Sequence, residues 1–222
     1  IPARAGSKGI PQKNLVDFCG KPLVSWSIAA AIESNIFSDI FLSTDSAEIA
    51  DFGIFCGLEI PCMRPSSLAT DDCSSALVCL HAIEVYKNLN RQVDNIVMLE
   101  PTSPLRTYED IRHGYSHFET NNLRSLVSVT ESISSHPDFC FNMPGYKLSP
   151  ITGNQPTSLR RQDIDKLFYP DGSLYISSVD SFVKHKSFYH LNTSGISLPK
   201  WKSIEIDDFE DVDYVIKKIK DK

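Results

Sequence analysis

The sequence has no long apolar run and no excess of positive charge. None of its hydrophobic stretches approaches the roughly 20 residues that a membrane-spanning helix needs. The formal net charge is -6, whereas nonspecific binding to nucleic acid or to an anionic membrane needs a cationic face. We therefore expect a soluble protein that binds neither nucleic acid nor membranes, and in which local cations meet any anionic ligand.

Closely spaced cysteine pairs are also absent. The six cysteines include no C-x-x-C pair, and several have apolar neighbours, as small hydrophobic residues do. We expect reduced core thiols in a cytoplasmic protein, with a disulfide or zinc role as the less favoured alternative. Internal repeats and low-complexity tracts are missing, and the length suits a single domain, 1–222. Because the chain starts at Ile1 without a methionine, we expect a short upstream piece.

Short apolar runs alternate with segments of helical period. The pattern predicts strands at 39–43, 58–62, 95–99, 126–129, 174–176 and 203–206, and helices at 22–34, 46–55, 74–88, 107–121 and 209–220. Such alternation is typical of an α/β fold with a mostly parallel sheet and helices on both faces. Ligands of such sheets bind beyond the carboxyl ends of the strands. Five prolines interrupt the pattern at 133–172, which we expect to be an irregular excursion from the domain.

The opening loop, residues 1–14, combines glycine with clustered positive charge. Its glycines allow a close backbone approach to a ligand, and its three cations suit a polyphosphate: Gly6, Gly9, Arg4, Lys8 and Lys13. The loop matches neither G-x-x-x-x-G-K-[ST] nor G-x-G-x-x-G, which excludes a P-loop and a dinucleotide fingerprint. Taken alone, the loop fits a surface turn about as well as a phosphate site.

Five segments together resemble the acylneuraminate cytidylyltransferases, the CMP-sialic acid synthetase family. They are the opening loop with Gly20-Lys-Pro22; Ser43-Thr-Asp45; residues 64–75; Leu99-Glu-Pro-Thr-Ser-Pro-Leu-Arg106; and Arg161-Gln162 followed by residues 169–176. The resemblance spans essentially the whole chain. It implies a Rossmann-like nucleotide-diphospho-sugar transferase fold. It also implies that the enzyme joins CTP to a nonulosonic (sialic-type) acid, giving the CMP-sugar and pyrophosphate.

The same resemblance implies the site residues. Catalytic roles fall on Arg4, Lys13 and Asp207. The implied nucleotide-binding residues are Arg4, Ala5, Gly6, Ser7, Lys8, Lys13, Asn14, Arg64, Asp71 and Ser75. The implied sugar-binding residues are Glu100, Pro101, Thr102, Ser103, Arg161, Asp171, Gly172, Tyr175, Phe188 and Tyr189. A solvated lysine is the alternative for Lys8, and ordinary core packing is the alternative for the three aromatic residues.

Magnesium, or another divalent cation, is the implied cofactor. Glu205 and Asp207 are alternate residues of an expected strand, so their carboxylates lie on one face and can bind the ion. The family usually has aspartate at both positions, so we expect Asp207 to be a direct ligand and Glu205 to act directly or through water. The resemblance further implies a homodimer in which the 133–172 excursion reaches the partner's sugar site.

Three residues depart from the family pattern on the sugar side. Glu100 and Asp171 replace neutral amides, and Phe139 stands where some members have a lysine. The added negative charge favours an amino- or amidino-modified nonulosonic acid of the legionaminic type, although the exact sugar stays open. The alternative for Glu100 is a pair with a nearby lysine or arginine, or with the metal, without contact to the sugar. The alternatives are a cytidylyltransferase for the eight-carbon acid Kdo and an inactive nucleotide-binding homologue. The loop cations and Asp207 are retained, which argues against the inactive homologue.

Overall fold

A four-stranded sheet forms the centre of the protein in the computed structural model, which describes residues 1–132, 136–153, 160 and 164–220. The strand order is β1-β5-β2-β6, with bounds Asn95–Met98, Phe168–Ser178, Ser125–Glu131 and Thr193–Ser197. β5 pairs antiparallel with both β1 and β2, while β2 pairs parallel with β6. Three strands of this sheet therefore run in one direction. The predicted mostly parallel sheet is confirmed, with β5 reversed.

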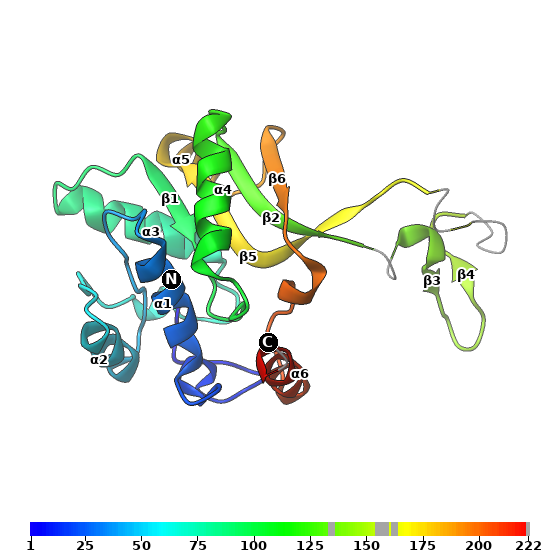
Figure 1. Ribbon diagram of the computed structural model, residues 1–222, viewed down its shortest axis with the longest axis horizontal. Helices are drawn as coiled ribbons and strands as arrows, with labels where there is room; N and C mark the ends of the chain where they lie inside the picture. Colours follow the sequence, from blue (N-terminus) through cyan, green and yellow to red (C-terminus); the bar gives the residue numbers. More distant parts are fainter. Residues whose placement is uncertain (133–135, 154–159, 161–163, 221–222) are drawn as a thin grey trace.

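Helices cover both faces of the sheet (Figure 1). Leu126 packs in a cluster with residues of α1 (Leu23–Ser34) and α4 (Tyr108–Thr120), whereas the next residue, Val127, packs with residues of α3 (Ser75–Asn88) and α5 (Val179–His185). Successive side chains of a strand point to opposite faces, so these two clusters are the two layers beneath the helices. The predicted α/β architecture is confirmed.

Two further helices pack in hydrophobic clusters with residues of the opening loop. α2 (Ala47–Phe55) buries Ile49 against Leu42, and α6 (Phe209–Lys220) buries Val215 beside Ile10. Short 3₁₀ turns join these elements at Lys13–Leu15, Ser66–Leu68, Pro137–Phe139 and Lys200–Lys202. Ser46 and Ser74 cap α2 and α3, since each hydroxyl accepts a hydrogen bond from a backbone N–H of the first turn.

Three predicted strands are not formed. Residues 39–43, 58–62 and 203–206 are buried in part but have no strand assignment. The first of them makes only an isolated parallel bridge, between Ser43 and Pro2. Leu42, Leu58 and Ile206 are nevertheless buried, so the apolar pattern correctly marked core segments while the hydrogen-bonded ladder is missing.

The proline-rich excursion extends away from the sheet. β2 and β5 run outward together and lead to a small lobe, in which β3 (Phe141–Asn142) pairs antiparallel with β4 (Ser149–Pro150) (Figure 1). Large apolar side chains of this lobe are exposed: Phe141, Met143, Tyr146, Leu148 and Ile151.

Two expectations from composition can be compared with the described residues. None of their helices is both long and apolar enough to cross a membrane. The six cysteines are all free, but Cys79 is buried whereas Cys19 is exposed. The expectation of core positions is therefore wrong for Cys19.

Candidate functional site

The opening loop borders a cavity of about 210 Å³ that gathers many of the predicted nucleotide-binding residues. Residues from four separate parts of the chain line it: the loop, the segment before α3, α3 itself and the segment after β1. The predicted residues among them are Arg4, Gly6, Ser7, Lys13, Asn14, Arg64, Ser75, Glu100 and Thr102. This convergence makes the cavity the candidate nucleotide site.

Hydrogen bonds to the neighbouring 43–45 segment position the loop. Ala3 N–H donates to the Ser43 carbonyl at 2.8 Å, and Ala5 N–H donates to Asp45 Oδ1 at 2.8 Å. Within the loop, Asn14 Nδ2 donates to the Arg4 carbonyl at 2.8 Å. Asn14 therefore holds the two ends of the loop together in this structure, with its amide turned to the backbone.

Each of the three loop cations has a carboxylate partner. Arg4 Nη1 lies 2.7 Å from Asp71 Oδ1, and Lys8 Nζ lies 3.1 Å from Asp71 Oδ2. Lys13 Nζ lies 3.0 Å from Asp207 Oδ1 and also donates to the Ile206 carbonyl at 2.8 Å. The cations thus link the loop to two distant segments, one before α3 and one before α6.

The far side of the cavity carries a buried guanidinium and a hydroxyl–carboxyl pair. Arg64 Nε donates to Ser43 Oγ at 3.0 Å and Nη2 donates to the Ser43 carbonyl, and burial lowers the pKa of Arg64. Ser75 Oγ donates to Glu100 Oε1 at 3.2 Å, and burial raises the pKa of Glu100. Glu100, predicted on the sugar side, therefore reaches the same cavity as Ser75.

The two loop glycines differ in their surroundings. A Cβ on Gly9 would lie 2.1 Å from the Asp207 carbonyl oxygen, whereas a Cβ on Gly6 would meet no atom within 4 Å. Gly9 is thus required for the loop to pack against the Asp207 backbone. Gly6 keeps open space at the cavity, which leaves room for a ligand to approach the backbone.

The acidic segment before α6 lies against the segment after β1 and against β5. Ile206 N–H donates to the Thr102 carbonyl at 2.8 Å. A Cβ on Gly172 would lie 1.9 Å from Glu205 Oε1, so the carboxyl group of Glu205 covers this glycine, whose φ is +73°. Burial, followed by the like charge of Glu100, raises the pKa of Glu205 to about 7.

The aromatic residues predicted for sugar binding form a cluster near this acidic group. The Tyr175 ring centroid lies 5.4 Å from that of Phe188 and 6.3 Å from that of Tyr189. Phe188 is buried and also packs against Phe182, with the two rings tilted by 51°. Core packing explains Phe188, whereas Tyr189 is exposed by 48% and available to a ligand.

The Asp171 side chain is hydrogen-bonded within the sheet. Its Oδ1 accepts hydrogen bonds from Ser128 Oγ and from Ser173 N–H, at the register shift where β2 and β5 lose their regular pairing. The side chain is 2% exposed, and its Oδ2 has no partner among the described residues. These contacts favour a role for Asp171 within the sheet over the predicted role in sugar binding.

Several predicted residues lie outside the cavity lining. Ala5 and Lys8 belong to the loop, and Asp71 and Asp207 form ion pairs with its cations. The others are spread over four places: Pro101 and Ser103 after β1; Asp171, Gly172 and Tyr175 in β5; Phe188 and Tyr189 between α5 and β6; and Glu205 before α6. Arg161 lies outside the described residues. Nothing among the described residues forms a group of three or more His, Cys, Asp or Glu side chains able to hold a metal ion. Glu205 and Asp207 alone therefore do not complete a metal site.

Two residues had no assigned role in the sequence and have one in the structure. Asp45 holds the loop through Ala5 N–H. The buried guanidinium of Arg106 donates to the carbonyls of Glu100 and Ser173, at 3.2 and 2.7 Å, and so joins the two sides of the site. Both residues belong to segments that carry the family resemblance, and this resemblance is the signal from which the sequence could have indicated them.

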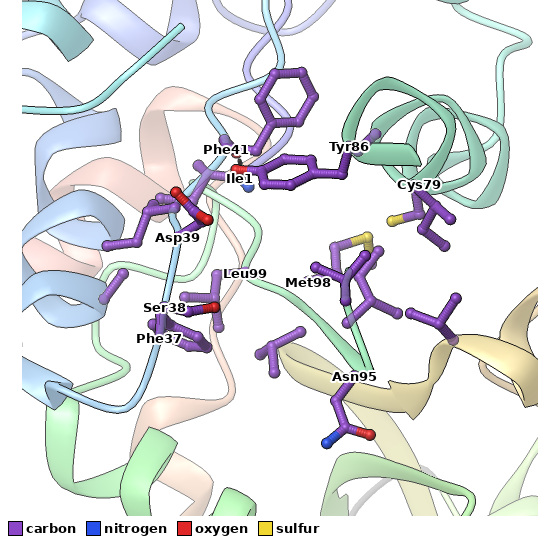
Figure 2. Close-up of a pocket in the computed structure, with 18 of the residues that line it drawn as sticks. Ile1, Phe37, Ser38, Asp39, Phe41, Cys79, Tyr86, Asn95, Met98 and Leu99 are labelled. Carbon is purple, nitrogen blue, oxygen red and sulfur yellow. Dashed lines mark hydrogen bonds between the residues drawn. The ribbon is translucent and has the colours of Figure 1, made fainter. Parts of the chain in front are cut away.

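A larger cleft of about 270 Å³ adjoins this cavity, with which it shares Pro2 and Val78, and lies between the 36–43 segment, α3 and β1 (Figure 2). Phe41, Tyr86 and Met98 line it, and its acidic residues are Asp39 and Asp94. Among the described residues no lysine or arginine lines this cleft. Its lining does not suit a polyphosphate, so the smaller cavity remains the candidate site.

Known proteins with similar sequences carry related functions in their names. An N-acylneuraminate cytidylyltransferase of Streptococcus agalactiae is 33% identical over 220 residues, 97% of this chain and 51% of that protein. A pseudaminic acid cytidylyltransferase of Campylobacter jejuni is 30% identical over 96% of this chain and 92% of that protein. A CMP-N,N'-diacetyllegionaminic acid synthase of Legionella pneumophila is 33% identical, over 93% and 89%. The chain spans about half the length of the first of these relatives.

Solved structures show the same fold. The structure of a CMP:2-keto-3-deoxy-manno-octonic acid synthetase complexed with CTP superposes with a TM-score of 0.70 over 99% of this chain and 96% of that chain, at 15% identity. A family model described as cytidylyltransferase matches residues 1–212. The chain belongs to the cytidylyltransferase family.

Proposed function

We propose that this protein transfers CMP from CTP to a nonulosonic acid and releases pyrophosphate. The observation that carries the proposal is the convergence of Arg4, Lys13, Arg64 and Ser75 on one cavity in a chain of this family. Two cations at the loop suit phosphates, and a hydroxyl at the start of α3 suits a nucleoside. The names of three relatives, which specify N-acylneuraminate, pseudaminic acid and N,N'-diacetyllegionaminic acid, support the class of sugar.

The chemistry follows from this placement. The anomeric hydroxyl oxygen of the sugar acid bonds to the α-phosphorus of CTP, and the bond from that phosphorus to the α–β bridging oxygen breaks, so that this oxygen leaves with pyrophosphate. The hydroxyl proton passes to solvent or a base. Phosphoryl transfer depends on positioning and charge stabilisation rather than on covalent chemistry by the protein. Arg4 and Lys13 would bind the triphosphate and stabilise the departing pyrophosphate.

A divalent cation fits the residues beside the loop, although they do not complete a site alone. Burial, and after it the charge of neighbouring carboxylates, raises the pKa of Glu205, and a cation would relieve the repulsion between these carboxylates. Asp207 is largely exposed and binds Lys13 through Oδ1, which leaves Oδ2 for a metal ion. We propose that Asp207 and Glu205 hold magnesium together with phosphate and water oxygens. When bound, the ion would neutralise charge on the phosphates.

The test is pyrophosphate release from CTP with a panel of sugar acids: N-acetylneuraminate, legionaminic-type and pseudaminic-type acids, and Kdo. Release with any of the nine-carbon acids supports the proposal. Release with Kdo alone would favour the eight-carbon alternative, for which the solved structure supplies only a likeness of fold. No release with any acid would support an inactive homologue.

A homodimer formed through the β3–β4 lobe is a further part of the proposal. Met143, Tyr146 and Leu148 are exposed on a lobe that extends away from the sheet. Exposed apolar side chains gathered in this way are typical of protein–protein contacts. Light scattering at micromolar concentration should give twice the mass of the chain, and Tyr146→Ser with Leu148→Ser should give a monomer.

Use of CTP as a substrate supports a cytoplasmic location.

A further inference from the structure

Asp71 holds two of the three loop cations at once. Its Oδ1 lies 2.7 Å from Arg4 Nη1 and its Oδ2 lies 3.1 Å from Lys8 Nζ. Hydrogen bonds from Lys8 and Arg4 lower the pKa of Asp71, so the carboxylate is ionised at neutral pH. The carboxylate therefore presents two negatively charged oxygens to the cations, as a phosphate group would.

A triphosphate in the cavity needs the same cations. Arg4 lines the cavity, and a phosphate that drew Arg4 Nη1 to itself would break the 2.7 Å contact of this nitrogen with Asp71. The carboxylate would also repel the several negative charges of CTP. Asp71 therefore opposes binding of the phosphates, although the family resemblance places it among the nucleotide-binding residues.

From this geometry we infer that Asp71 competes with the phosphates of the nucleotide for Arg4 and Lys8. In the nucleotide-free protein Asp71 holds these two cations, and it releases them when CTP binds. This inference rests on the proposed function. Lys13 is held differently, because its partner Asp207 is a proposed metal ligand. Arg64 is held by Ser43 and has no part in the exchange.

The effect is expected to be modest because the ion pairs are partly exposed. The Lys8 side chain is 79% exposed and that of Asp71 is 38% exposed. Such pairs typically change an equilibrium by about two- to fivefold. Asp71→Asn keeps the shape of the side chain and removes its charge, so we expect inorganic triphosphate and CTP to bind about two- to fivefold tighter to this variant.

Calorimetric titration of the purified protein with inorganic triphosphate, CTP and cytidine tests this inference. Asp72→Asn is the matched control, since Asp72 is also exposed and makes no ion pair with any other described residue. Asp72→Asn should bind triphosphate nearly as the wild type does, and cytidine should bind equally to all three proteins. A Lys8→Met background supplies a second test, in which the gain from Asp71→Asn should shrink because one of the two competing pairs is already gone.

The outcomes separate this inference from the proposed function. If the wild type binds CTP and Asp71→Asn binds it equally or more weakly, Asp71 is not a competitor and the inference is wrong. Weaker binding of both CTP and cytidine would instead make Asp71 a direct nucleotide ligand. If neither protein binds CTP or triphosphate, both the inference and the proposed function are overturned. Equal gains in Asp71→Asn and Asp72→Asn would also overturn it, because they would reflect net charge alone.

Discussion

Lys13 and Asp207 join the opening loop to the segment before α6, across 194 residues of sequence. Lys13 Nζ lies 3.0 Å from Asp207 Oδ1, and the lysine side chain is 13% exposed whereas that of the aspartate is 75% exposed. The ammonium group is therefore fixed at the cavity, while the carboxylate faces solvent. One contact thus connects the proposed triphosphate site to the proposed metal ligand.

Replacing Lys13 with alanine should lower the rate of pyrophosphate release by about 10²- to 10³-fold, because the variant loses a fixed cation at the transferring phosphates. The measurement is turnover with saturating CTP and the preferred sugar acid. Lys21→Ala is the matched control, since the Lys21 ammonium lies 3.9 Å from the Trp26 ring centroid and outside the cavity lining. Normal turnover in the Lys13 variant would remove the loop from the active site.

The two acidic residues of the 205–207 segment should differ in their contribution to metal dependence. We expect Asp207→Asn to lose more activity than Glu205→Gln, because Asp207 is exposed and close to the loop cation. Activity should require a divalent cation and disappear with chelator. The measurement is turnover as a function of magnesium concentration in both variants. Full activity in chelator, or a greater loss in Glu205→Gln, would contradict this assignment.

The loop glycines should respond oppositely to alanine. Gly9→Ala places a methyl group against the Asp207 backbone, so we expect the free energy of unfolding to fall by about 1–3 kcal/mol. Gly6→Ala meets open space and should change stability by less than about 0.5 kcal/mol, yet weaken CTP binding because Gly6 lines the cavity. Urea denaturation and calorimetry measure the two effects. Similar stability of the two variants would show that the loop does not pack on Asp207 in solution.

Local signals explain why α1 to α4 and α6 were predicted, whereas the short helix α5 and the strand β6 were missed. Ser46 and Ser74 cap α2 and α3 through bonds that depend only on the next three residues, so the sequence marks both starts. Strand pairing depends on distant partners. Leu42 is buried as its apolar neighbourhood predicts, but whether the 39–43 segment forms a ladder depends on Pro2, and only a single bridge forms.

The candidate site, like the fold, was predictable where the signal is local and not where it depends on distant residues. Loop composition identified Arg4, Lys8 and Lys13 as cations for a polyphosphate, because their clustering is visible in fourteen consecutive residues. Their carboxylate partners were not predictable, since Asp71 and Asp207 approach the loop only through the tertiary fold. For the same reason the sequence does not distinguish Glu100, which reaches the cavity, from Asp171, which is bonded within the sheet.

The raised pKa of Glu205 predicts a pH dependence of stability. Between its ordinary pKa of 4.5 and about 7, the folded protein keeps a proton that the unfolded chain releases. This contribution to stability is complete below pH 4.5 and is lost as the pH rises through about 7. In the absence of metal and nucleotide, the wild type should therefore lose more thermal stability between pH 5 and pH 8 than Glu205→Gln. Other titrating groups are common to both proteins and cancel in this difference. Identical pH profiles would show that Glu205 titrates normally.

The last prediction concerns the sugar and depends on Glu100. The Glu100 carboxyl group accepts a hydrogen bond from Ser75 at 3.2 Å and makes no ion pair with any other described residue. Arg106 donates to the carbonyl of Glu100 and not to its carboxyl group. A cationic substituent on the substrate would give this carboxylate a charged partner, whereas plain N-acetylneuraminate offers none.

We therefore expect the wild type to prefer an amino- or amidino-substituted acid of the legionaminic type, and Glu100→Gln to shift the ratio of kcat/KM values toward N-acetylneuraminate by about tenfold, as loss of a charge-assisted hydrogen bond would. Asp171→Asn is the control, because the Asp171 carboxylate already accepts hydrogen bonds from Ser128 and Ser173. It should lower stability without changing the ratio. A wild type that prefers N-acetylneuraminate, with no shift in Glu100→Gln, would show that Glu100 does not select the sugar. A shift in Asp171→Asn alone would place the sugar against β5 instead of beside Ser75.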